Sequence, residues 1–234
     1  MTPQEQSPPA EAFWSYQDLA FFVSFAFLSF VVSALLAAIL RRHGPVVRLI
    51  LPQLLLYVFV VGSLLAIFRL RYREPFWRAM GIRYPDKGSW IAAFAGVALA
   101  FAVATLGVLL RAREIQLPFG DFLRTPLATA ALGILVVLLG PFCEELVFRG
   151  FLMPLFVRSL TALPGILLAA AIFGCMHGFE YQWSWQYVLL ISLAGVAFGY
   201  ARYLARSTTA SMLMHATFNL TQFAAFLFSQ HTKW

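Results

Sequence analysis

Hydrophobic residues follow one another in long stretches along this chain, and short polar or charged segments separate the stretches. An α-helix needs about 20 such residues to cross a bilayer, and most of the stretches reach this length. The pattern therefore predicts an all-α, polytopic transmembrane helical bundle with about seven spans. These are expected at residues 17–40, 46–68, 89–110, 126–157, 164–180, 186–203 and 207–229.

Two polar segments interrupt this pattern in different ways. Residues 1–16 are expected to be a polar N-terminal tail, because the apolar stretch that follows is too long for a cleavable signal. Residues 17–234 are then expected to form a single membrane domain. Between the second and third spans, "PFWRAMG" starts with Pro and ends with Gly, so an interfacial helix is conceivable near 75–80. An ordinary basic loop explains that segment equally well.

Composition narrows the class of protein further. Hydrophobic residues make up 61% of the chain and charged residues only 12%, which excludes a water-soluble fold. The net charge of +7 comes largely from Lys and Arg beside the spans, so we expect the lipid bilayer as a partner and no nucleic acid. Cys143 and Cys175 both lie in apolar stretches, where cysteine usually behaves as a small hydrophobic residue.

The same basic residues predict an orientation. With the N-terminus inside, the inner segments hold ten of the 17 Lys and Arg residues and the outer segments hold seven. The positive-inside rule then favours a cytoplasmic N-terminus. We expect an integral protein of a bacterial or archaeal cell membrane.

Three charges lie where the fourth apolar stretch should be deep in the membrane: Glu144, Glu145 and Arg149 in "GPFCEELVFRG". A carboxylate at the centre of a span costs about 2.5–3.5 kcal/mol, so these side chains must face protein or water. Glu145 and Arg149 are four residues apart and can pair on one helical face. Glu144 has no such neighbour and needs either a partner from another helix or a shifted pKa, which makes it the better catalytic candidate. Pro141 should bend this long span.

Two histidines also fall within predicted spans, His177 and His215, and Asn219 follows His215 by one helical turn. The loops near 158–164 and 203–207 lie on the same side of the membrane. At 1.5 Å per residue, Glu144, His177 and His215 are roughly 21, 20 and 12 Å from that side. Scattered polar contacts between helices would explain each residue alone, but the similar depths indicate that they converge.

The motifs "EELVFR", "FGCMH" and "HATFN", in this order, resemble those of the CAAX prenyl endopeptidase type II and bacteriocin-processing family, known as the CPBP or ABI intramembrane proteases. The resemblance covers a catalytic part at about residues 126–229. It implies an intramembrane endopeptidase whose cavity opens toward the cytoplasm. The implied substrate is a membrane-associated protein, a prenylated chain or a peptide precursor, and the sequence does not choose among these.

The resemblance also implies a role for each motif residue. Glu144 and His177 would activate the attacking water, and His215 with Asn219 would stabilise the oxyanion. Glu145 and Arg149 would hold the site together.

A metal is the alternative, because Glu144, His177 and His215 are an allowed ligand set for a catalytic Zn²⁺. The common helical zinc motif has two histidines four residues apart, and here the second position is Asn219, a poor zinc ligand. We therefore favour a glutamate mechanism without metal.

Two other classes of protein would also place charges inside a membrane. A transporter is less favoured, since the charged residues gather in the C-terminal half and no repeat of broken helices is visible. A non-catalytic protein that binds a membrane partner would often lack one of the motif residues, and all are present here.

Overall fold

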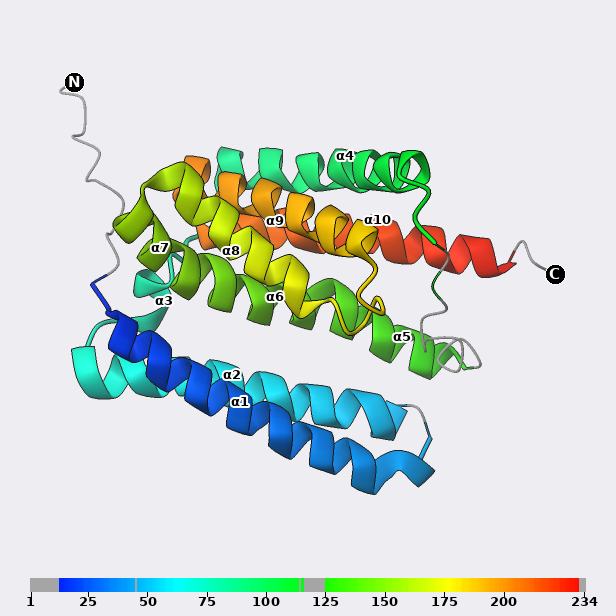
Figure 1. Ribbon diagram of the computed structural model, residues 1–234, viewed down its shortest axis with the longest axis horizontal. Coiled ribbons are helices and arrows are strands. Elements are labelled where there is room, and N and C mark those ends of the chain that lie inside the picture. The colour runs from blue at the N-terminus through cyan, green and yellow to red at the C-terminus, as the bar shows by residue number, and fades with distance from the viewer. Residues whose placement is uncertain (1–12, 45, 114, 116–124, 232–234) are drawn as a thin grey trace.

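The computed structural model describes residues 13–44, 46–113, 115 and 125–231. In this part of the chain the structure consists of helices and turns, without strands. Figure 1 shows the helices running along a common long axis. The pair α1 (Tyr16–Ile39) and α2 (Leu51–Ile67) lies on one side of the bundle, and α4 (Lys87–Leu109) lies on the opposite side.

The remaining helices fill the space between these two sides and complete the bundle. They are α3 (Phe76–Ala79), α5 (Pro126–Ile134), α6 (Gly140–Glu145), α7 (Met153–Leu160), α8 (Ala162–Met176), α9 (Trp185–Ala205) and α10 (Thr208–His231). Short 3₁₀ or π-helical segments extend or join them at Leu40–Arg42, Val46–Ile50, Phe68–Tyr72, Leu135–Leu139 and Leu146–Leu152.

The all-α, polytopic architecture expected from the sequence is confirmed. Among the described residues, five helical stretches are long and apolar enough to cross a membrane: Tyr16–Arg42, Val46–Tyr72, Lys87–Leu109, Pro126–Leu160 and Trp185–Ala205. Of the other two expected spans, α10 is 24 residues long but more polar. Helix α8 has 15 residues, which at 1.5 Å each cover about 22 Å, less than the ~30 Å hydrocarbon core.

The fourth span is one continuous helical stretch, Pro126–Leu160, 35 residues long. Pro141 lies in the first turn of α6, and π-helical segments lie directly before and after α6. A proline has no N–H to continue the α-helical hydrogen bonds, so the predicted irregularity at this position takes the form of wider turns. These turns flank the segment that carries the two glutamates.

Close helix contacts hold the C-terminal half together. A Cβ at Gly96 of α4 would collide with the Met214 carbonyl of α10, and a Cβ at Gly174 of α8 would collide with Ser192 of α9. Small residues at such positions let helix backbones approach closely, which is how helices commonly pack within membranes. Helices α10 and α8, which carry or end at motif residues, are therefore packed tightly against α4 and α9 respectively.

The end of the expected polar tail takes part in the core. Trp14 is only 1% exposed, and its Nε1 donates a hydrogen bond to the Phe151 carbonyl at 3.1 Å. The two rings also stack with centroids 5.8 Å apart. Of the expected tail, residues 1–12 lie outside the described part of the chain.

A short helix is present where an interfacial helix was considered. Phe76 and Met80 are buried, and Trp77 is 48% exposed. The following residue, Gly81, accepts a hydrogen bond from the Thr208 N–H at 2.8 Å, so this segment caps the start of α10. The segment therefore packs on the bundle, and its place at the membrane surface stays a prediction.

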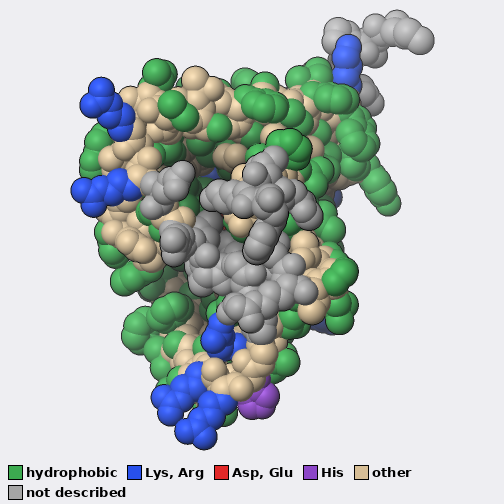
Figure 2. Space-filling model, turned by 90° about the vertical axis from the view of Figure 1, so that its right-hand side faces the viewer, with side chains coloured by type: hydrophobic (Ala, Val, Ile, Leu, Met, Phe, Trp, Pro, Cys, Tyr) green, Lys and Arg blue, Asp and Glu red, His purple; other side chains and the backbone are tan. Residues whose placement is uncertain are grey.

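The outer surface has the character expected for contact with lipid. Large hydrophobic side chains are exposed along the long helices, including Phe27, Phe94 and Leu109 at 69%, 77% and 73%. Figure 2 views one end of the bundle. Hydrophobic side chains occupy much of the surface at the edges of this view, and basic side chains and a histidine lie together at its bottom. Arg41, Arg42 and His43 lie in the turn after α1.

Candidate active site

The pair predicted from the four-residue spacing is present. Arg149 Nη1 donates to Glu145 Oε1 at 2.8 Å, and the two side chains are 1% and 0% exposed. The pairing holds although the intervening turn belongs to a π-helical segment. Removing either partner would leave the other as an unpaired buried charge, so the pair stabilises this turn of the helix.

Glu145 also binds a histidine from another helix. His215 Nδ1 lies 3.0 Å from the same Oε1 atom. An ionised carboxylate can only accept hydrogen bonds, so His215 donates through Nδ1 and its Nε2 points away from Glu145. Glu145 therefore links Arg149 of the fourth span to His215 of α10.

Aromatic rings surround this buried ion pair. The Arg149 guanidinium lies over the rings of Phe173 and Phe198, at 4.6 and 5.3 Å from their centroids, and donates through Nη2 to the Gly195 carbonyl at 2.9 Å. Phe198 also stacks on His215 with centroids 4.4 Å apart. Ring faces and a backbone carbonyl offset part of the cost of burying the guanidinium.

Glu144 differs from its neighbour in both exposure and partners. Its side chain is 26% exposed, and its Oε2 lies 3.8 Å from His215 Nε2. That distance is too long for a direct hydrogen bond. His215 of α10 is therefore near Glu144 without bonding to it, and Glu144 is the more accessible of the two carboxylates.

His177 does not lie inside a helix, contrary to the sequence expectation of a span at 164–180. It is the C-cap of α8, directly before Gly178, a residue type that often ends helices. His177 Nδ1 is 2.8 Å from the Phe173 carbonyl. A carbonyl can only accept, so Nδ1 carries the proton and Nε2 is left as an acceptor.

Phe173 lies beside both histidines. Its ring centroid is 4.6 Å from that of His177 and 5.8 Å from that of His215. One buried aromatic residue thus packs against the two imidazoles and the Arg149 guanidinium. The "FGCMH" motif therefore supplies packing as well as a histidine.

Asn219 makes a different contact from His215. Its Nδ2 donates to the Val136 carbonyl at 2.7 Å. Val136 belongs to the π-helical segment Leu135–Leu139, so this bond joins α10 to the fourth span. An Asn amide carries two N–H groups, and this bond uses one of them.

Two residues near Glu144 were missed by sequence reasoning. Tyr57 of α2 lies by Gly140, and Glu180 lies in the turn after α8. Glu180 keeps an exposed surface, but partial desolvation raises its pKa, the Glu144 charge acts in the same direction, and His177 opposes both. Neither residue belongs to a motif, so no signal in the sequence distinguishes them from other polar residues at helix ends or within spans.

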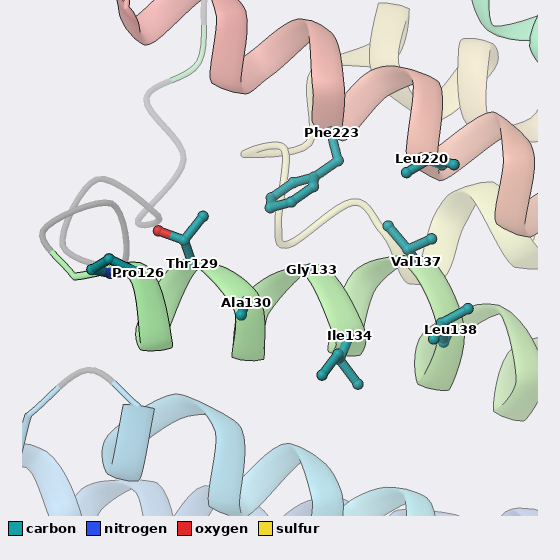
Figure 3. Close-up of a pocket in the computed structure, with 9 residues that line it drawn as sticks. All are labelled: Pro126, Thr129, Ala130, Gly133, Ile134, Val137, Leu138, Leu220 and Phe223. Atoms are coloured by element: carbon teal, nitrogen blue, oxygen red, sulfur yellow. The ribbon is translucent and has the colours of Figure 1, made fainter.

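An apolar groove of about 600 Å³ begins beside the site. Figure 3 shows it between α5 with its π-helical extension and α10. Two of its lining residues, Val137 and Leu220, directly follow Val136 and Asn219, which share a hydrogen bond. The lining residues are Pro126, Thr129, Ala130, Gly133, Ile134, Val137, Leu138, Leu220 and Phe223.

The predicted metal ligands do not form a metal-binding group. Across the described residues, no three His, Cys, Asp or Glu side chains are close enough to hold an ion together. Glu144 and His215 approach each other, but His177 does not complete a set with them. We therefore derive no catalytic step through zinc.

Comparison with known proteins gives a family for this region. Residues 126–221 match the family described as "Type II CAAX prenyl endopeptidase Rce1-like". Searches of curated proteins and of solved structures found no match. The matched region contains all six predicted site residues: Glu144, Glu145, Arg149, His177, His215 and Asn219. Residues 126–221 are thus similar to the type II CAAX prenyl endopeptidases, and this match supports membership of that family of intramembrane proteases.

Proposed function

We propose that this protein is an intramembrane endopeptidase in which Glu144 and His177 activate a water molecule. The observation that carries the proposal is the arrangement around His215, which is bound to buried Glu145 through Nδ1 and faces Glu144 through Nε2. One carboxylate is locked in an ion pair, and the other is accessible. This is the division of roles that a structural pair and a general base require.

The reaction follows from these groups. Glu144 takes a proton from water while His177 Nε2 accepts the second hydrogen bond of that water. The resulting hydroxide attacks the peptide carbonyl carbon, and the carbonyl oxygen becomes an oxyanion. When the intermediate collapses, the C–N bond breaks and Glu144 returns the proton to the leaving amine.

His215 and Asn219 would stabilise the oxyanion. Asn219 has an N–H beyond the one that binds Val136. With both ring nitrogens protonated, His215 keeps its bond to Glu145 through Nδ1 and donates through Nε2. Donors that are fixed before the reaction stabilise a developing charge well, and burial at 4% exposure strengthens the contribution of His215.

The groove supports a substrate with an apolar flank. Its walls are mainly carbon, and it starts next to Asn219. A lipid-modified chain or an apolar peptide segment would bury its surface there while the adjoining peptide bond reaches Glu144. The proposed substrates are thus membrane-associated proteins, prenylated chains or peptide precursors.

A comparison of new peptide N-termini tests this function. Membranes that carry the native chain, Glu144→Gln or Glu74→Gln are compared by labelling N-termini and identifying the peptides. Glu74 is exposed and lies between α2 and α3, so its variant is the matched control. We expect termini that depend on Glu144 and persist in the control. Identical termini in all three membranes would refute the proposal.

The same substrates test the role of metal. Purified protein dialysed against a strong chelator should retain cleavage and contain well under one equivalent of zinc. Loss of cleavage on chelation with recovery on adding Zn²⁺ would replace the metal-independent mechanism with a metal-dependent one.

A further inference from the structure

A tyrosine from outside the matched family region lies beside Glu144. Tyr57 is in α2, and its hydroxyl oxygen is 3.3 Å from the position that a Cβ would occupy at Gly140. Glu144 Oε1 is 3.7 Å from that same position. Gly140 and Glu144 are one helical turn apart, so the hydroxyl and the carboxylate oxygen both border the same small space on one face of α6.

Gly140 keeps this space open. A methyl group there would lie 3.1 Å from the Leu135 carbonyl as well as 3.3 Å from the Tyr57 hydroxyl. Both distances are closer than side-chain carbons normally approach such atoms. The absence of a side chain at Gly140 therefore leaves a space between the Tyr57 hydroxyl and the Glu144 carboxylate.

The surroundings of Tyr57 are polar although α2 is a membrane span. Gln53, one turn earlier, interacts with the hydroxyl, and Glu144 and Glu180 are the charged groups that act on it. A tyrosine hydroxyl in an apolar span needs a hydrogen-bond partner, because an unpaired polar group there is costly. Of these groups, Glu144 belongs to the candidate active site and Glu180 lies near it.

The two oxygens of Glu144 face different helices. Oε2 is directed to His215 of α10, and Oε1 is directed to the space shared with Tyr57 of α2. A general base works efficiently only when its oxygen is held in the direction of the water that it deprotonates.

We propose that Tyr57 is a positioning residue for Glu144, and this inference rests on the proposed function. The Tyr57 hydroxyl donates to the attacking water that Glu144 Oε1 binds, and thereby fixes the orientation of the water and the carboxylate. The α1–α2 pair, which the matched region does not include, thus completes the active site.

Tyr57→Phe tests the proposal, because it removes only the hydroxyl. The reporter is a peptide that contains a cleavage site shown to depend on Glu144. We expect kcat to fall about tenfold, the effect of losing one aligned hydrogen bond. KM and the thermal unfolding temperature should stay unchanged. Tyr203→Phe, at an exposed tyrosine of α9, is the control and should match the native enzyme.

A double-mutant cycle separates positioning from packing. Gly140→Ala should also lower kcat, and in the Tyr57→Phe background it should have a smaller effect, because the hydroxyl that it displaces is already absent. Additive effects of the two changes would overturn the proposal. So would an unchanged kcat in Tyr57→Phe, or a fall in kcat that is matched by a fall in unfolding temperature. Cleavage that survives Glu144→Gln would instead refute the proposed function.

Discussion

Glu144 and Glu145 are neighbours in the chain but have different environments. Glu145 is fully buried and binds both Arg149 and His215 through one oxygen. Glu144 is partly exposed and has no partner at hydrogen-bond distance within the described residues. Successive residues of a helix point about 100° apart, so adjacent carboxylates serve different faces. The structure thus supports a structural role for Glu145 and leaves Glu144 available for chemistry.

Substituting each glutamate separately tests this division. Glu144→Gln should abolish cleavage with little change in the thermal unfolding temperature. Glu145→Gln should lower that temperature, because it leaves Arg149 buried without its counter-charge, at a cost of about 3–5 kcal/mol. It should also reduce cleavage, since His215 loses its carboxylate. An equal loss of stability in both variants, or an active Glu144→Gln enzyme, would contradict separate roles.

At the scale of elements, irregular helices shape the site. The two π-helical segments flank α6, and Val136 of the first segment accepts the Asn219 hydrogen bond. The short helix α8 ends at Met176, so His177 lies at the start of a turn with Glu180 close behind it. These departures from regular α-helix occur where motif residues meet, as is common at functional sites.

Filling the groove between α5 and α10 should weaken substrate binding. Thr129 lines the groove, and Thr129→Trp would occupy the space of an apolar substrate flank. We expect KM for the reporter peptide to rise about tenfold, because each buried CH₂ is worth about 0.8 kcal/mol. Leu127→Trp, at a 78% exposed position of α5 outside the groove lining, is the control. An unchanged KM in Thr129→Trp would exclude the groove from substrate binding.

At the scale of the whole molecule, the order of the helices determines which residues share a side of the membrane. Helices α4 and α10 start at the same end of the bundle, where the Arg83 N–H donates to Thr209 Oγ1 at 3.1 Å. The turn between α7 and α8 lies at that end as well. The excess of basic residues in these segments predicts that this end faces the cytoplasm.

Cysteine labelling tests the orientation. Ser159 is exposed at the end of α7, and His43 lies in the turn after α1, at the opposite end. In a background with Cys143→Ala and Cys175→Ala, Ser159→Cys should resist an impermeant reagent until the membrane is opened. His43→Cys should react in intact cells. The reverse pattern would show that the predicted orientation is wrong.

The sequence by itself determined the class of protein and most of its elements. Long apolar stretches can satisfy their backbone hydrogen bonds in a membrane only as helices or closed barrels, and their length indicated helices. The Glu145–Arg149 pair was also predictable, because residues four apart in a helix meet regardless of the rest of the fold. Both results depend on local spacing, which is fully contained in the sequence.

The tertiary structure decided what joins residues far apart in the chain. In the folded protein, His215 bonds to Glu145 and lies near Glu144. Asn219 bonds to Val136, and Tyr57 of α2 lies close to Gly140. The tertiary structure also ended α8 early, which moved His177 to a helix end. These features depend on helix rotation and close packing, and hydropathy does not encode them, because lipid-facing and buried apolar residues look alike in the sequence.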